Sequence, residues 1–169
     1  IAGVGEILRE PIGAGDLARR IGDVHRPYHA AIAAALAAAH RAHGFAVLID
    51  CHSMPPLKNG APQVVIGDRF GRSAGAQVVD AAVAAVRGAG VSVARNDPYA
   101  GAHILDRHGS PARRVHAVQV EFDRTLYLAP DLRSPGSGMA AAAALLATVA
   151  RACVAAARPH GGTVLMAAE

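Results

Sequence analysis

The segment FAVLIDCHSMPP, residues 45–56, decides the fold class and points to the chemistry. Residues 45–49 form a short apolar, β-prone run, which is typical of a strand covered on both faces. The polar residues DCHS follow at once, and two prolines then end the extended segment. The sequence thus places polar groups at the carboxyl end of a buried strand, where open α/β sheets gather their ligands.

Helical and extended segments alternate along the rest of the chain. Hydrophobic periodicity predicts helices over 14–43, 73–87 and 139–157. Pro27 predicts a kink or break in the first of them near residues 23–26. Apolar runs predict further strands at 63–66, 91–94 and 115–122, with a terminal strand or tail at 163–166 and a long functional loop over 96–110. This alternation predicts an α/β fold of three layers, αβα, with a largely parallel or mixed sheet.

Composition limits the classes of protein that the chain can represent. Its 169 residues fit one catalytic-type domain over 1–169. The net charge is +4, but the arginines are scattered and do not form basic clusters with interleaved aromatic residues, which argues against nucleic-acid binding. No signal peptide is visible, and the alanine-rich segment 139–157 holds Arg151, so we expect a packed helix and no membrane contact. The sequence leaves the oligomeric state open.

Two cysteines and the amino-acid bias suggest where the protein works. Cys51 and Cys153 are far apart and lack CxxC spacing, which fits a reducing cytoplasm better than a disulfide framework. The abundance of Ala, Arg and Gly is typical of a GC-rich bacterial genome. We therefore expect a cytoplasmic bacterial protein.

His52 is the first candidate for chemistry. Asp50 lies two residues earlier and points to the same side of an extended chain, so it can orient the imidazole from the second shell of a metal site. His52 would then be a metal ligand. The alternative is a partly buried histidine that is satisfied by local hydrogen bonds.

Glu121 is the second candidate. In HAVQVEFDRTLYL, residues 116–128, Gln119, Glu121 and Asp123 alternate with apolar residues that face the other way. A carboxylate beside a metal-bound water can take its proton, whereas the alternative is an edge strand with one solvated face. We expect Asp50, His52, Asn96 and Glu121 to converge on one edge of the sheet.

Two arginines are candidates for holding an anion. Arg69, in GDRFGRSAG (67–75), is a substrate clamp or a surface cap. Arg107, in NDPYAGAHILDRHG (96–109), is a candidate anchor for a substrate carboxylate, while the histidines of that segment fit a solvated loop. His25 and His29 have the i, i+4 spacing of a zinc pair but lack the intervening glutamate of a zinc-protease motif.

Five motifs in order resemble the N-formylglutamate amidohydrolase family, which is distantly similar to zinc carboxypeptidases and aspartoacylases. The motifs span roughly residues 5–135 and are RPYHAAI (26–32), VLIDCHSMP (47–55), GDRFGRSA (67–74), NDPYAGAHILDRHG (96–109) and VHAVQVEFDRTLYL (115–128). The resemblance implies a phosphorylase/hydrolase-like αβα fold with one catalytic Zn²⁺.

The resemblance also implies roles for individual residues. His52 corresponds to the third protein ligand of the zinc ion, and Glu121 to the general acid/base. Arg69, Asn96 and Arg107 are the candidates for holding substrate carboxylates. The family takes its other two ligands from an upstream segment, so we expect them before Ile1 and regard the chain as N-terminally incomplete.

These implications lead to one expected function and two alternatives. We expect zinc-dependent hydrolysis of an N-formyl amino acid, with N-formyl-L-glutamate giving formate and L-glutamate, a step of histidine breakdown. The ligand is therefore a small N-acyl amino acid. The alternatives are another carboxypeptidase- or aspartoacylase-like amidohydrolase and a truncated, non-catalytic binding module.

Overall fold

The computed structural model describes residues 11–57 and 62–159, and the chain divides into two compact units, Ile1–Ala35 and Leu36–Glu169. Each unit is described by itself. The predicted terminal segment 163–166 lies outside the described residues, and the expectation of a single domain over 1–169 stays a prediction.

The helix predicted over 14–43 is present as one continuous helical stretch with a change of type in the middle. It consists of α1 (Ala14–Arg20), a π-helical turn η1 (Ile21–His25) and α2 (Arg26–His43). The π turn directly precedes Pro27, which cannot donate a backbone hydrogen bond and whose ring crowds the carbonyl of Asp23. The expected irregularity near Pro27 is therefore met by a local change of helix type.

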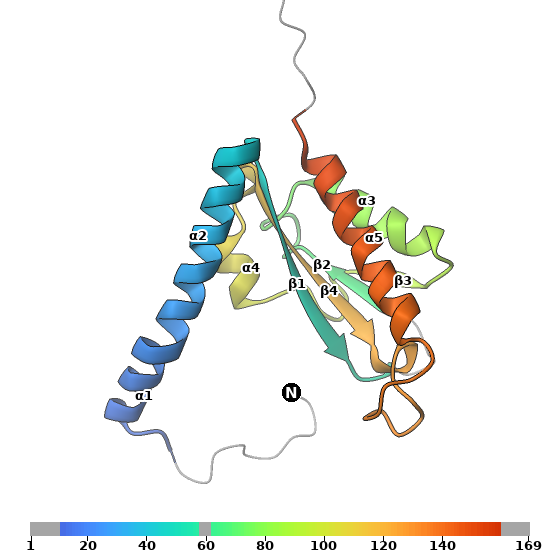
Figure 1. Cartoon of the computed structure of the whole chain (residues 1–169), viewed down its shortest axis with the longest axis horizontal. Helices are drawn as coiled ribbons and strands as arrows, with labels where there is room; N and C mark the ends of the chain where they lie inside the picture. The colour runs from blue at the N-terminus through green and yellow to red at the C-terminus, as the bar shows by residue number, and fades with distance from the viewer. Residues whose placement is uncertain (1–10, 58–61, 160–169) are drawn as a thin grey trace, which may run out of the picture. The chain divides into compact units, whose positions relative to one another are not determined.

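The second unit contains a mixed four-stranded sheet (Figure 1). Its strands lie in the order β1 (Ala46–Met54), β4 (Val115–Asp123), β2 (Val64–Gly67) and β3 (Val93–Arg95). β1 runs parallel to β4, and β3 runs parallel to β2, but β2 is antiparallel to β4. The predicted α/β class with a mixed sheet is confirmed.

Two helices, α3 (Ala76–Gly88) and α5 (Met139–Ala157), cover one face of the sheet (Figure 1). The core between them is built almost wholly from small aliphatic residues, such as Val64, Ile66, Val78, Val118 and Val149. Because such side chains are short, the layers pack closely and the core needs few aromatic residues. The alternation along β4 then leaves Gln119 and Glu121 on the opposite face.

The long helix α5 is apolar enough, by length and composition alone, to cross a membrane. Its buried residues recur on one side, at Leu145, Val149 and Cys153, and belong to the core that it shares with α3. This is the pattern of a helix that packs one stripe against a protein core.

The opposite face of the sheet is covered in part by the segment that the sequence predicted as a loop. That segment contains a short helix, α4 (His103–His108), whose Leu105 is fully buried. A Cβ atom on Gly67 would lie 2.8 Å from the backbone of Ala100, so the chain crosses β2 in direct backbone contact. Glycine at position 67 makes this close approach possible.

Candidate active site

His52 and Asp50 lie on β1 itself, because β1 extends to Met54 and does not end at residue 49 as predicted. The strand is longer because every residue from Ala46 to Met54 pairs with β4. The Nε2 atom of His52 lies 2.9 Å from Oδ1 of Asp50, as the spacing of the two residues predicted. The carboxylate can therefore fix the orientation of the imidazole and leave the other ring nitrogen for a ligand.

Glu121 is the neighbour of His52 across the sheet. His52 pairs with Glu121, and Asp50 pairs with Gln119, in the parallel register of β1 and β4. Since neighbouring strands lie about 4.8 Å apart, all four side chains start close together on one face. We call these four residues the polar cluster. The structure thus brings His52, Asp50 and Glu121 together.

The environment of Glu121 favours its protonated form. The residue is buried, and burial raises the pKa of its carboxyl group; the charge of Asp50 raises it further and His52 lowers it. Gln119 Nε2 donates a hydrogen bond of 2.9 Å to Glu121 Oε1. A carboxyl group with a raised pKa that stays hydrogen-bonded is suited to accept and return a proton.

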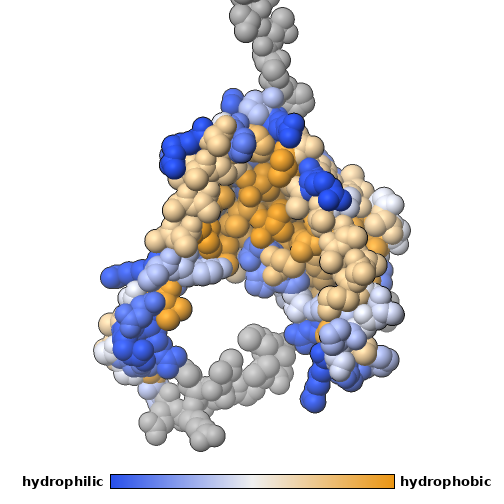
Figure 2. Space-filling model, in the orientation of Figure 1, coloured by the Kyte–Doolittle hydropathy of each residue, from blue (hydrophilic) through white to orange (hydrophobic). Residues whose placement is uncertain are grey.

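The face of β1 next to α5 is hydrophobic in character (Figure 2). A pocket of ≈ 390 Å³ opens there at the end of β1, and it is lined by Cys51, His52, Ser53, Phe122, Tyr127, Met139, Ala142, Ala143 and Leu146. A charged amino acid needs polar partners in its site. The polar cluster, whose His52 also lines this pocket, is therefore the better candidate for chemistry, and Cys51, which lines the pocket, is not part of the cluster.

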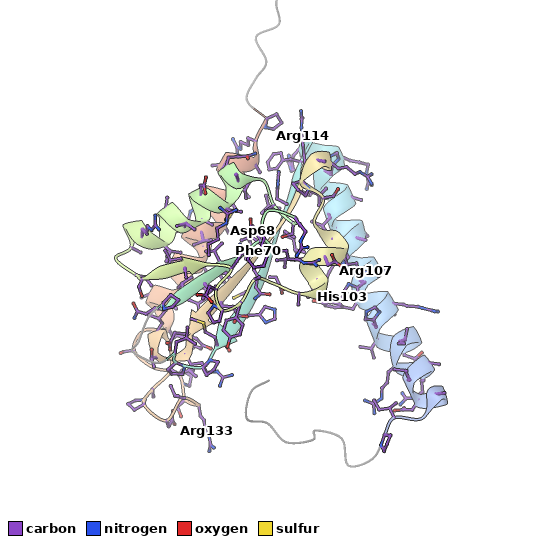
Figure 3. All side chains as sticks on the ribbon, turned by 180° about the vertical axis from the view of Figure 1, so that it is seen from behind. Asp68, Phe70, His103, Arg107, Arg114 and Arg133 are labelled. Atoms are coloured by element: carbon purple, nitrogen blue, oxygen red, sulfur yellow. The ribbon has the colours of Figure 1, made fainter. Side chains whose placement is uncertain are left out.

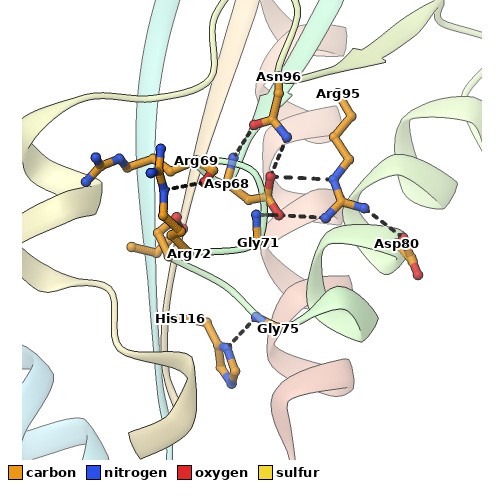
Figure 4. Close-up of polar contacts among 11 residues, drawn as sticks. Asp68, Arg69, Gly71, Arg72, Gly75, Asp80, Arg95, Asn96 and His116 are labelled. Carbon is orange, nitrogen blue, oxygen red and sulfur yellow. Dashed lines mark hydrogen bonds and ion pairs between the residues drawn. The ribbon is translucent and has the colours of Figure 1, made fainter.

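The turn after β2 is organised by Asp68, which is fully buried (Figure 4). Its carboxylate accepts hydrogen bonds from Asn96 Nδ2 at 2.6 Å, from Arg95 at 2.7 Å and from the backbone N–H of Gly71 at 3.1 Å. The backbone N–H of Asp68 in turn donates to Asn96 Oδ1 at 2.9 Å. These contacts satisfy a buried charge that would otherwise be costly.

The same turn holds three successive residues in the left-handed region. The φ angles are +53° at Arg69, +58° at Phe70 and +83° at Gly71. Each non-glycine residue in this region costs about 1–2 kcal/mol. Such a conformation persists only where the surroundings fix it, and the contacts of Asp68 together with the bond from Arg69 N–H to Ala100 C=O do so here.

The two arginine candidates lie on neighbouring segments. Arg69 pairs with Asp106 of α4, and its side chain is largely covered. Arg107 follows on α4 and is exposed (Figure 3). The structure therefore brings Arg69 and α4 together, and substrate binding by either arginine stays a prediction.

Asn96 does not lie at the edge where β1 and β4 end. Asn96 follows β3, which is separated from β4 by β2 and from β1 by both β2 and β4, and the carboxyl ends of β2 and β3 point away from the edge where β1 and β4 end. The expectation that it would converge with His52 and Glu121 on one edge is wrong, because that edge holds the carboxyl ends of β1 and β4 but not those of β2 and β3. Its amide group holds Asp68 in this structure, and its predicted role in substrate binding stays a prediction.

The first unit contains two histidines with the geometry of a metal pair. The rings of His25 and His29 have centroids 4.4 Å apart, and their ligand nitrogens lie within 4.8 Å of one another. Imidazole nitrogens at this separation could hold a divalent metal ion. Their separation as well as their spacing in sequence is thus compatible with a shared metal ion.

Sequence reasoning missed the roles of Gln119 and Asp68. Gln119 could have been found from its alternation with Glu121, since two polar residues on one face of a buried strand need each other as partners. Asp68 gave only a weak signal, an acid directly after an apolar strand. The partners of Asp68 lie almost thirty residues further along the chain, beyond the reach of local patterns.

A carboxyl group beside an oriented imidazole can exchange a proton with a bound water. The family model for N-formylglutamate amidohydrolase matches residues 1–128. The chain belongs to the N-formylglutamate amidohydrolase family, a family of hydrolases that act on linear amides, and the predicted resemblance is confirmed.

Individual relatives agree with this assignment. An N-formylglutamate deformylase of Pseudomonas aeruginosa is 36% identical over 118 residues, which cover 65% of this chain and 44% of that protein. Another of Pseudomonas putida is 30% identical over 116 residues, which cover 65% of this chain and 43% of that protein. The chain thus spans less than half the length of these relatives.

Solved structures share the fold. The crystal structure of N-formylglutamate amidohydrolase from Ralstonia eutropha superposes with a TM-score of 0.73 at 30% identity, over 88% of this chain and 55% of that one. A protein of Agrobacterium tumefaciens superposes with a TM-score of 0.62 at 23% identity, over 85% of this chain and 55% of that one. The second likeness concerns the fold alone.

Proposed function

We propose that the polar cluster is the catalytic centre of a metal-dependent hydrolase that cleaves N-formyl-L-glutamate to formate and L-glutamate. The observation that carries the proposal is the register of β1 and β4, which sets His52 directly beside Glu121. The family membership and the two deformylases from Pseudomonas support the choice of substrate.

His52 could supply one nitrogen ligand to a divalent metal, with Zn²⁺ as our choice. His52 would hold it through the ring nitrogen that Asp50 does not bind. When bound, the metal would polarise the formyl carbonyl and lower the pKa of a bound water. His25 and His29 are further imidazoles that could bind such an ion.

Glu121 would act as the general base and then as the general acid. Its raised pKa lets it take a proton from water and deliver that proton to the leaving amine. Gln119 keeps the carboxyl group in place during both transfers through its hydrogen bond to Oε1. Arg69 would bind the side-chain carboxylate of the substrate and so position the amide over the polar cluster.

The test is release of formate from N-formyl-L-glutamate by the zinc-loaded chain. Glu121→Gln should lower kcat by about 100-fold or more, because the amide keeps the shape of the carboxyl group but cannot carry the proton. His52→Ala should lower the bound zinc as well as the activity. His43→Ala, which removes an exposed imidazole of the same unit, should change neither. Full activity in Glu121→Gln would contradict the proposal.

A second candidate is a binding module for carboxylates without hydrolytic activity. It is favoured by one observation, that among the described residues of the second unit the polar cluster contains a single imidazole, His52, whereas a catalytic zinc usually has three protein ligands. Binding of glutamate without turnover of any N-acyl amino acid would select this candidate.

A further inference from the structure

Arg69 holds its guanidinium group in an unusual setting for a surface residue. The turn that carries it is fixed by the contacts of Asp68, and its backbone N–H donates to Ala100 C=O at 2.8 Å. The side chain passes beside Gly101, where an added Cβ atom would lie 3.7 Å from Arg69 Cγ. A long and normally flexible side chain is therefore held in one direction.

This direction leads to the face of the sheet that holds the polar cluster. Gly67 pairs with Gln119 in β4, so both residues present the same face. Ala100 and Gly101 cross over Gly67 on that face, and Arg69 packs beside them. Arg69 and the polar cluster are therefore on one side of the sheet.

The carboxylate that pairs with Arg69 belongs to an exposed residue, so the ion pair contributes little free energy. Asp106 binds Arg69 Nη1 from α4, and its side chain remains 64% exposed, against 21% for Arg69. An ion pair with so much solvent access is worth little, whereas the covered guanidinium retains its need for an anion. A carboxylate from solution that also makes contacts elsewhere can therefore displace Asp106.

We propose that Asp106 is a built-in competitor that occupies the carboxylate-binding site of Arg69 until a ligand carboxylate replaces it. This inference rests on the proposed function for the class of ligand, a dicarboxylic N-acyl amino acid. It gives the chain a means of discrimination, because only a ligand whose second carboxylate reaches Arg69 can displace Asp106. Ligands with one carboxylate near the polar cluster leave the pair intact.

Binding of glutarate, a dicarboxylate that cannot be hydrolysed, to the full chain tests this competition. Calorimetric titration should show about five-fold tighter binding in Asp106→Asn than in the unaltered chain, because the competitor is gone. Arg69→Gln should weaken binding by about tenfold or more. Asp16→Asn is the matched control, since Asp16 is likewise an exposed partner of arginine side chains, and it should leave binding unchanged.

The proposal that Asp106 competes for Arg69 would be overturned by unchanged or weaker glutarate binding in Asp106→Asn, or by unchanged glutarate binding in Arg69→Gln. It would also be overturned if neither the unaltered chain nor Asp106→Asn bound glutarate. Formate release from N-formyl-L-glutamate, measured on the same preparations, separates this inference from the proposed function. Turnover without the expected glutarate response contradicts the competitor alone. The expected response without turnover supports the competitor and contradicts the hydrolase.

Discussion

The surroundings of Glu121 disfavour the ionised form of its carboxyl group. Burial and the neighbouring Asp50 both raise its pKa, and His52 opposes them only in part. The unfolded chain has no such environment, so its Glu121 ionises at the ordinary pKa of 4.5. Between that value and the raised value in the fold, the folded protein binds more protons than the unfolded chain, and its stability falls as the pH rises.

Replacing Glu121 by glutamine should therefore stabilise the protein at neutral pH. Above the raised pKa the whole cost of the buried charge is present, and the amide avoids it while still accepting the hydrogen bond from Gln119. We expect a gain in unfolding free energy at pH 7.5. Urea titrations should show this gain shrinking toward zero at pH 4, where the carboxyl group is protonated in both states. An equal gain at both pH values would contradict the assignment.

Asp68 is a second buried carboxylate, but its charge is balanced by Arg95 and its oxygens accept several hydrogen bonds. Asp68→Asn should lower the unfolding free energy by about 2–3 kcal/mol, because the amide cannot accept all the hydrogen bonds from Arg95, Asn96 and Gly71. Asp80→Asn is the control, since Asp80 meets the same Arg95 at 3.5 Å but is 71% exposed, and it should cost less than about 0.5 kcal/mol. An equal loss of unfolding free energy in the two variants would contradict the stabilising role of the Asp68 network.

Local patterns could predict those site residues whose partners are close in sequence. Asp50 and His52 are two residues apart on a strand, so their hydrogen bond followed from the alternation of an extended chain. The same alternation put Gln119 and Glu121 on one face. The network around Asp68 joins segments far apart in sequence, and only the tertiary fold brings them together.

At the scale of elements, the sequence could not supply the direction of β2. An apolar run of four residues such as Val64–Gly67 fits either direction equally well, because its side chains face both layers and carry no sign of orientation. The antiparallel pairing with β4 then placed Asn96 away from His52 and Glu121. The short helix α4 was missed because six residues give too little periodicity to detect.

The crossing of β2 by the segment before α4 depends on Gly67. Gly67→Ala should lower the unfolding free energy by about 1–3 kcal/mol, since the new Cβ atom would lie 2.8 Å from Ala100 C and 2.9 Å from its oxygen. Gly88→Ala, at the end of α3 with no atom within 4 Å of the new group, should be neutral or stabilising by up to about 1 kcal/mol. Chemical denaturation of the two variants measures the difference. A tolerated Gly67→Ala would show that the crossing segment can move away.

At the scale of the whole molecule, the composition and the order of motifs were enough to predict the class of fold and the family. A core of valine and alanine needs flat layers packed closely, and the alternation of elements left only an α/β arrangement. The division into two compact units was not visible, because the helical pattern over 14–43 is continuous in sequence and in structure.

The two cysteines report on the integrity of the whole fold. Cys153 is fully buried between α3 and α5, and burial raises the pKa of its thiol to about 11, whereas Cys51 is exposed. A disulfide reagent at neutral pH should therefore modify one thiol in the native protein and a second only after unfolding. The first reaction should be slow, because burial and the charges of Asp50 and Glu121 raise the pKa of Cys51.

The measurement is the stoichiometry and rate of thiol release in buffer and in denaturant. Cys51→Ala should abolish the reaction in buffer and leave one reactive thiol in denaturant. Two thiols that react at one rate in the native protein would mean that the contact between α3 and α5 opens readily.

Every residue of β1 from Ala46 to Met54 pairs with a residue of β4, so the polar cluster depends on the number of residues in β1 ahead of Asp50. A single inserted residue within β1 ahead of Asp50 would invert the strand, so that Cys51 and Ser53 met Glu121's face while His52 turned into the hydrophobic layer. Two inserted residues would return both side chains to their original face, but Asp50 would then lie opposite Glu121 and His52 opposite Asp123. We therefore expect insertions of an odd number of residues in β1 to be tolerated less well than insertions of an even number, because only the odd ones invert the two faces of the strand.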